Sequence, residues 1–244
     1  MNKHGVLSII LCLIVSALPG TAQEQIKTGP SPSLKSWTGG VLVGVARNDI
    51  DMNSKFNHNP ESVNDNIGFQ VGAFVQTYKY LLWEADLLYK ERVFSIENHA
   101  LEDYGYDADM NMQYLELMFK FGPRFEVAGV STHLFCGLGW GHLLNAKEKY
   151  VVNLGGVMIR GEFELNNDGF MKKCLDRNSI VYNLGINLNP SFLQKRFEIG
   201  MSVDFVKPTK EYAKKELEGA YDPLFNEFWL SNISVYCKFA IFPI

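Results

Sequence analysis

The sequence has few long apolar runs. Beyond its first 22 residues, no stretch approaches the about 20 apolar residues that a membrane-spanning helix needs. If the chain crosses a membrane, it must therefore do so with strands. The formal net charge of -4 argues against a nucleic-acid-binding protein, since such proteins carry basic patches.

Cysteine is also scarce. One of the four cysteines, Cys12, lies in the apolar N-terminal run. The other three, Cys136, Cys174 and Cys237, are an odd number at irregular spacing, which predicts neither a disulfide framework nor a zinc site. The sequence contains no phosphate-binding glycine motif and no histidine pair at metal-ligand spacing. We therefore expect no cofactor and no metal.

The N-terminus has the pattern of an export signal. A short basic region precedes an apolar run that is too short to span a membrane, and small residues follow at Gly20 and Ala22. This predicts a signal peptide over residues 1–22. Residues 23–36 are polar, contain two prolines and predict a disordered lead-in. Residues 37–244 then form a single β domain.

Period-two alternation fills that domain. In residues 111–121, NMQYLELMFKF, the apolar Leu115, Leu117, Phe119 and Phe121 alternate with a face that carries both signs of charge. Because successive strand side chains point to opposite faces, this is a strand with one apolar and one mixed face. Seven further segments alternate in the same way, giving eight predicted strands at residues 37–48, 66–78, 81–94, 111–121, 132–144, 180–190, 196–206 and 228–242.

The links between these segments are alternately long and short. This rhythm is typical of transmembrane barrels, which have short periplasmic turns, longer external loops and an even strand number. It predicts an all-β, eight-stranded antiparallel up-and-down transmembrane barrel with periplasmic termini. Ten strands are the alternative, if residues 150–154 and 157–165 form an additional hairpin around Gly155 and Gly156.

The charges indicate which face points inward. The less apolar face is rich in glycine and carries charges of both signs on neighbouring strands, where unpaired buried charge would be costly. We therefore expect Glu116 and Lys120 to join an ion-pair network inside the barrel. Its other predicted members are Glu84, Asp86, Lys90 and Arg92, with Glu198, Asp204 and Lys238 on the same face.

Aromatic residues support the same orientation. Trp and Tyr favour membrane–water interfaces, and several of them lie near strand ends on the apolar face. They are Trp37, Trp83, Tyr89, Trp140, Tyr182 and Trp229. The alternative is a secreted soluble barrel or sandwich with the apolar face as its core, but it would need solvent-facing glycines or asparagines on nearly every strand.

Residues Tyr114-Leu115-Glu116-Leu117, with Lys120 shortly after, resemble the Y-L-E-I-P-L-x-x-K signature of the PorT-like outer-membrane β-barrel proteins of Bacteroidetes. The strand at Cys136-Gly137-Leu138-Gly139 is similar to a G-x-G-x strand of the same family. Met118 stands where the family usually has proline. The resemblance implies a small porin-like barrel in the outer membrane. A role in protein secretion, which one family member has, does not follow from it.

Catalytic and metal-binding candidates are few. Ser131 and His133 lie two residues apart on one predicted strand face, and with Glu116 they could form a nucleophilic trio such as lipid deacylases use. Both lie at the predicted periplasmic end, far from the outer leaflet that holds lipopolysaccharide. Asp103, Asp107 and Asp109 lie in a predicted loop without the spacing of a calcium-binding motif. We therefore assign no catalytic or metal-binding residue.

The sequence thus predicts a non-enzymatic barrel of the cell outer membrane with a filled, charged lumen, acting as a structural or loop-mediated binding or assembly component. Its expected partners are membrane lipid and lipopolysaccharide, with other envelope proteins as candidates for contacts through the loops, and no nucleic acid. The alternatives are a PorT-like accessory barrel of a secretion system, a lipid-modifying enzyme, or a secreted soluble barrel.

Overall fold

The computed structural model describes residues 37–52, 67–78, 81–101, 104–127, 129–165, 175–190, 196–208 and 228–243. The predicted signal peptide and lead-in lie outside these residues. The described residues form nine strands. Among these residues, no helix is long and apolar enough to cross a membrane. The strands are β1 (Trp37–Met52), β2 (Ile67–Tyr78), β3 (Leu81–Leu101), β4 (Tyr104–Val127), β5 (Val130–Leu154), β6 (Val157–Glu164), β7 (Asn178–Pro190), β8 (Phe197–Val206) and β9 (Phe228–Pro243).

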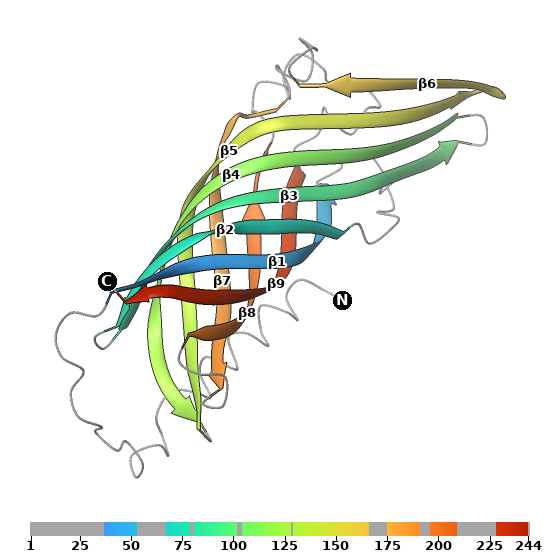
Figure 1. Ribbon diagram of the computed structural model, residues 1–244. Helices are drawn as coiled ribbons and strands as arrows, with labels where there is room; N and C mark the ends of the chain where they lie inside the picture. Colours follow the sequence, from blue (N-terminus) through green and yellow to red (C-terminus); the bar gives the residue numbers. More distant parts are fainter. Residues whose placement is uncertain are drawn as a thin grey trace. The chain divides into compact units, whose positions relative to one another are not determined.

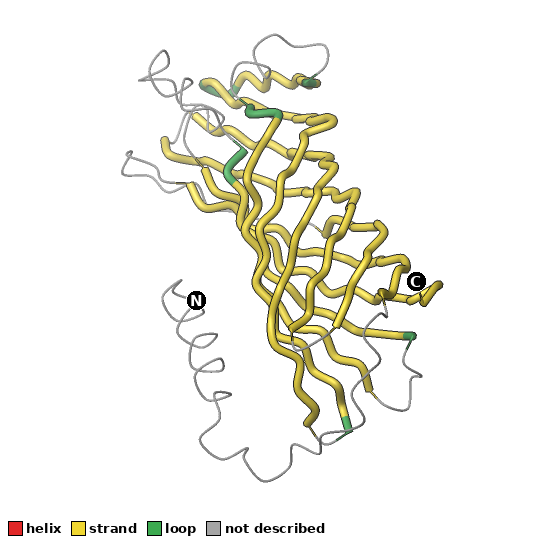
Figure 2. Tube along the Cα trace, turned by 90° about the vertical axis from the view of Figure 1, so that its left-hand side faces the viewer, coloured by secondary structure: helices red, strands yellow, loops and turns green. Residues whose placement is uncertain are grey.

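Eight of the described strands close into a ring. Neighbours along the chain pair antiparallel from β1 to β5, β5 pairs with β7, and β9 pairs with β1 to complete the circuit. Figures 1 and 2 show these strands curving around a shared interior. The predicted eight-stranded antiparallel barrel is therefore confirmed. A closed ring leaves no sheet edge along its wall.

The register of the ring sets the width of the barrel. Stepping from His142 on β5 through the paired residues of β4, β3, β2, β1, β9, β8 and β7 leads back to β5 at Thr132, ten residues away. This ten-residue offset is the shear of the barrel. For eight strands, a shear of ten residues corresponds to a strand tilt of about 40°. A barrel of this size has an interior just wide enough to be filled by side chains.

The two ends of the ring differ in their connections. At one end, here called the short-turn end, β2–β3, β4–β5 and β7–β8 are joined by short links. At the other, the long-loop end, β3 and β4 continue as far as Leu101 and Tyr104. The sequence predicts a loop between the strands at residues 81–94 and 111–121. Most of residues 95–109 are strand instead, because the pairing of β3 with β4 continues to Leu101 and Tyr104.

The predicted hairpin around Gly155 and Gly156 exists, but the ten-strand alternative is wrong. Residues 150–154 continue β5, and the chain turns at the two glycines, both of which have positive φ. β6 then pairs with residues 147–154 of β5, whereas β7 pairs with residues 130–142 of the same strand. The hairpin therefore extends the barrel wall at the long-loop end and adds no strand to the ring.

The two faces of the strands are sharply different. Phe119 on β4 is 59% exposed, whereas its neighbours Met118 and Lys120 are buried. The same alternation runs through β1, β2, β3, β8 and β9. The outward face carries most of the large apolar side chains, and the inward face carries most of the charge. This inverts the arrangement expected of a soluble barrel.

Glycines on the inward face make room for large side chains on neighbouring strands. A Cβ at Gly200 would lie 2.1 Å from the ring of Tyr236, and one at Gly139 would lie 2.0 Å from the Met118 sulfur. A Cβ at Gly185 would meet the Phe135 ring at 2.4 Å. The interior is therefore packed by pairing small residues with large ones.

Replacement of Gly200 by valine should prevent or strongly impair barrel closure, since the added atoms overlap the ring of Tyr236. The adjacent Met201 faces outward and is exposed, so Met201→Val is a matched control that should leave folding unchanged. Folding can be measured as heat-modifiable migration on a gel after refolding. Normal folding of the Gly200 variant would contradict this account of the interior.

Candidate functional site

The charged interior of the barrel is the most distinctive chemical feature of the fold. Its ionisable groups come from β3, β4, β8 and β9, so the network joins strands on opposite sides of the ring. Every predicted member of the network is at most 6% exposed. They are Glu84, Asp86, Lys90, Arg92, Glu116, Lys120, Glu198, Asp204 and Lys238.

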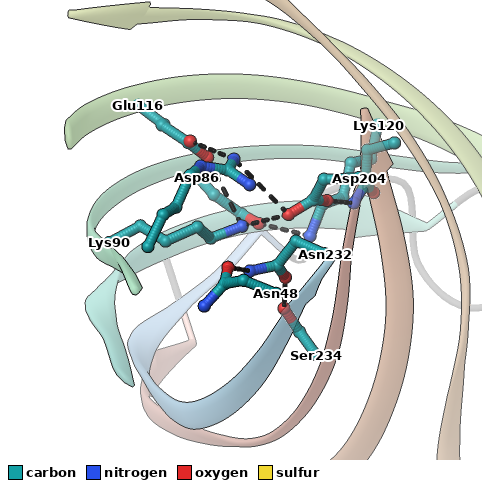
Figure 3. Close-up of polar contacts among 10 residues, drawn as sticks. Asn48, Asp86, Lys90, Glu116, Lys120, Asp204, Asn232 and Ser234 are labelled. Atoms are coloured by element: carbon teal, nitrogen blue, oxygen red, sulfur yellow. Dashed lines mark hydrogen bonds and ion pairs between the residues drawn. The ribbon is translucent and has the colours of Figure 1, made fainter. Parts of the chain in front are cut away.

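One cluster lies toward the long-loop end of the lumen. Arg92 donates a hydrogen bond to Glu116 over 2.6 Å, and Lys90 lies 3.4 Å from the other oxygen of the same carboxylate. Lys90 also pairs with Asp204 on β8, across the barrel. Figure 3 shows Lys90, Glu116 and Asp204 converging on one another. Two cations thus share two carboxylates in this cluster.

A second cluster lies closer to the short-turn end. Lys120 contacts Glu84 over 3.2 Å and Asp86 over 2.5 Å. Lys238 on β9 reaches across the lumen to the other oxygen of Glu84. The Lys120 ammonium also lies 4.9 Å from the ring centroid of Phe135, within the range of a cation–π interaction.

Neutral polar side chains add hydrogen bonds to the two clusters. Asn183 donates to Asp204, and Gln76 donates to Glu198 over 3.2 Å. The Tyr236 hydroxyl donates to Asn187 over 2.7 Å. A separate chain runs from Ser234 to Asn232 and on to Asn48, each step 2.6 Å long (Figure 3). These bonds satisfy polar groups that would otherwise be buried at a cost.

Little free space remains between these groups. A cavity lined by Lys90, Lys120, Asp204 and Tyr236, among others, leaves about 10 Å³ for the centres of water molecules. That is roughly the room that one water requires. Beyond Arg92, toward the long-loop end, the buried side chains are mostly apolar, although Glu148, which pairs in register with Met110, is also buried there. The apolar ones include Phe94, Met110, Met112, Leu143, Val181, Val206 and Leu230.

The predicted ion-pair network is confirmed: Glu116 and Lys120 contact the four predicted members of the network on β3, Glu84, Asp86, Lys90 and Arg92. The prediction missed several neutral residues that hold it together. Asn232 and Tyr236 share the inward phase of β9 with Lys238, and Asn183 and Asn187 alternate with the outward Tyr182 and Leu188 of β7. This phase was the available signal. Leu165 and Leu175, also buried, lie outside the strands and give no such signal.

The proposed catalytic trio does not assemble. The Ser131 hydroxyl lies 3.3 Å from Nε2 of His133, and Arg124 donates to the same hydroxyl over 2.7 Å. Glu116, however, pairs in register with Gly141, whereas His133 pairs with Arg124 near the short-turn end. The Glu116 carboxylate is held by Arg92 and Lys90. It therefore cannot orient His133.

The candidate calcium ligands are also dispersed. Asp107 and Asp109 lie on β4 rather than in a loop, and Asp109 accepts a hydrogen bond from Ser95 over 2.5 Å. Asp103 lies outside the described residues. Within the described part of the chain, no group of three or more acidic, histidine or cysteine side chains could hold a metal ion.

The fold and its interior define a class: an eight-stranded antiparallel barrel with an apolar outer wall and a packed, charged lumen. No protein-family model matches the chain, and no curated protein matches it. The resemblance to PorT-like barrels therefore stays a prediction.

Several solved structures have a similar arrangement of strands. Ail, the attachment invasion locus protein of Yersinia pestis, is 13% identical, with a TM-score of 0.40 over 85% of this chain and 100% of that chain. CarO of Acinetobacter baumannii is 12% identical, with a TM-score of 0.41 over 81% and 96% of the two chains. Neisserial surface protein A is 9% identical, with a TM-score of 0.39 over 82% and 96%. Likenesses this distant do not bear on function.

Replacing Arg92 by methionine should destabilise the barrel by about 3–5 kcal/mol, because Glu116 would stay buried without its closest partner. The double variant Arg92→Met/Glu116→Gln should recover a large part of that loss, because no unpaired carboxylate remains there. The measurement is the urea midpoint of unfolding in detergent micelles or lipid vesicles. Equal instability of the single and double variants would contradict the assigned pairing.

Proposed function

We propose that this protein resides in the outer membrane as a non-enzymatic barrel, and that its filled lumen supports an external binding or assembly surface. The observation that carries the proposal is the inversion of its two faces. Apolar side chains are exposed around the wall, while the charged ones are buried and paired. Only an apolar solvent around the barrel makes that arrangement favourable.

The dimensions of the apolar wall support a membrane location. On β3 the outward residues from Leu81 to Tyr89 are apolar, and Glu91 then introduces charge. Nine residues at about 3.3 Å each and a tilt of about 40° cover about 23 Å of height. This is comparable to the roughly 25 Å apolar band of outer-membrane barrels.

Aromatic side chains add to this support. All four tryptophans of the chain, Trp37, Trp83, Trp140 and Trp229, are outward and at least 36% exposed. Trp83 stacks on Phe121 with ring centroids 6.0 Å apart, on the outside of the barrel. Exposed indole rings are unfavourable in water but are stabilised at a membrane interface.

The orientation follows from the asymmetry of the two ends. Short turns face the periplasm in barrels of this kind, while the longer connections are external. We therefore place the short-turn end and both termini on the periplasmic side. The extended parts of β3, β4, β5 and β6 then project outside the cell, where lipopolysaccharide and envelope proteins are the available partners.

The packed lumen argues against an open pore. Cross-lumen ion pairs and the buried side chains around Met110 and Met112 fill the described part of the lumen, and the cavity between the ion pairs has room for about one water. The interior acts instead as a rigid support for the projecting strands, and binding sites commonly lie on segments held by such a scaffold.

The alternatives have less support. The lipid-modifying enzyme relied on Ser131, His133 and Glu116, and Glu116 is held elsewhere. A secreted soluble barrel would leave the exposed apolar wall in water. The PorT-like role in secretion rests on sequence resemblance alone, and it requires partners at the short periplasmic turns.

Cell fractionation tests the proposal. The protein should sediment with outer membranes, resist extraction by high salt and migrate on gels in a heat-modifiable way, because a closed barrel resists unfolding by cold detergent. Recovery in the soluble periplasmic fraction with one heat-independent band would refute the membrane assignment.

A further inference from the structure

The turn between β5 and β6 carries a group of exposed apolar side chains, here called the apolar tip. It comprises residues 154–159, LGGVMI, which contain no charged side chain. Its large side chains, Leu154, Val157, Met158 and Ile159, are between 46% and 66% exposed. Exposed apolar residues that are scattered singly are common, but a contiguous group of them marks an interaction surface.

The apolar tip lies apart from the apolar wall of the barrel. On β5, Leu144 is the last exposed apolar residue of that wall, and the exposed Lys147 and Lys149 follow it. Ten residues at about 3.3 Å each place Leu154 about 33 Å farther along the strand. Figure 1 shows the turn between β5 and β6 at the far end of the projecting strands. A membrane around the barrel therefore does not cover the tip.

The turn itself is open and satisfies its own backbone. A Cβ at Gly155 or Gly156 would meet no atom within 4 Å. Both glycines have positive φ, which permits a tight two-residue turn. The Gly156 N–H donates to Oδ1 of Asn153 over 3.1 Å, so this amide has a partner within the hairpin. An amide that is already satisfied loses less when the turn leaves water.

Apolar side chains lie on both faces of the tip. Leu154 pairs in register with Val157 and shares a face with it, and Ile159 lies on that face two residues farther along β6. Met158 points to the opposite face because successive strand residues alternate. A protein surface laid against the hairpin would cover one face and leave the other in water. A fluid lipid layer can surround the tip and cover both faces at once.

A cation follows the tip directly. Arg160 is exposed and lies opposite Val151 of β5 in the register. Farther from the turn, Glu162 lies opposite Lys149. Along the hairpin Arg160 is therefore the charge closest to the tip, and on the neighbouring β4 Asp107 lies at the level of Val151. A guanidinium at the base of an apolar tip is placed to donate to lipid phosphate groups when the tip enters the acyl region.

We propose that the apolar tip inserts into the phospholipid layer of an opposing membrane, with Arg160 at its phosphate groups. The tip contains three residue pairs and is about 10 Å long, which matches the about 5–10 Å to which peripheral apolar faces enter a bilayer. The tip lies at the long-loop end, which faces away from the cell in the proposed orientation. The membrane that it meets therefore belongs to another cell or vesicle.

This inference rests on the proposed outer-membrane location, and two measurements keep the two claims apart. The protein is first incorporated into lipid nanodiscs, where co-elution with disc lipid and heat-modifiable migration report the membrane location. The loaded discs are then mixed with protein-free phospholipid liposomes, and co-flotation reports insertion of the tip. Loaded discs should float with the liposomes, whereas empty discs should not.

Matched variants assign the binding to the tip. Val157→Asp should lower liposome binding by about tenfold, because a charged side chain replaces an apolar one that enters lipid. Val127 is 56% exposed at the short-turn end, so Val127→Asp is the control that should leave binding unchanged. Arg160→Glu should also weaken binding, because lipid phosphate repels a carboxylate, whereas Arg160→Lys should retain most of it.

Three results would overturn the insertion of the tip. Loaded discs could bind no liposomes, the Val157→Asp variant could bind like the native protein, or Val127→Asp could lower binding equally. Binding to cell-derived membranes but not to protein-free liposomes would indicate a protein partner and would also overturn it. Failure of the protein to enter nanodiscs would overturn the membrane location, and the inference with it.

Discussion

The pairing of buried charges across the lumen is the constraint on which the rest of the structure depends. Lys90 reaches Asp204 and Lys238 reaches Glu84, so strands on opposite sides of the ring are joined by ion pairs. A buried pair of this kind contributes little net stability relative to apolar packing, but leaving one partner alone is strongly unfavourable. We infer that the network favours the ring order and shear in which every partner is present, and so helps to specify the closed barrel.

The inward charges also explain the outward face. Because the charged and glycine-rich side of each strand fills the lumen, the alternating apolar side must face outward on every strand. That produces a continuous apolar wall, and such a wall is stable only in lipid. Fold and interior chemistry are therefore consequences of one period-two pattern, and the proposed membrane location rests on the same pattern.

Much of this could be predicted from the sequence. Alternation in segments such as residues 111–121 identified the eight ring strands, and charges of both signs on adjacent strands predicted the network around Glu116 and Lys120. Strand length could not be predicted at the long-loop end. Residues 95–109 carry acidic and glycine residues typical of a loop, yet residues 95–98, 101 and 104–109 pair as strands, in the same sheet that β5 and β6 extend. The separation of Glu116 from His133 could not be predicted either, because it depends on a register that neither strand encodes alone.

The central claim is that the apolar face contacts lipid, and quenching of tryptophan fluorescence tests it most directly. All four tryptophans lie on that face, so no substitution is needed. In vesicles made with brominated acyl chains, we expect strong quenching of the native protein relative to the same vesicles without bromine, and weak quenching by aqueous acrylamide. Emission that acrylamide quenches but brominated lipid leaves unchanged would place these residues in water and contradict the account.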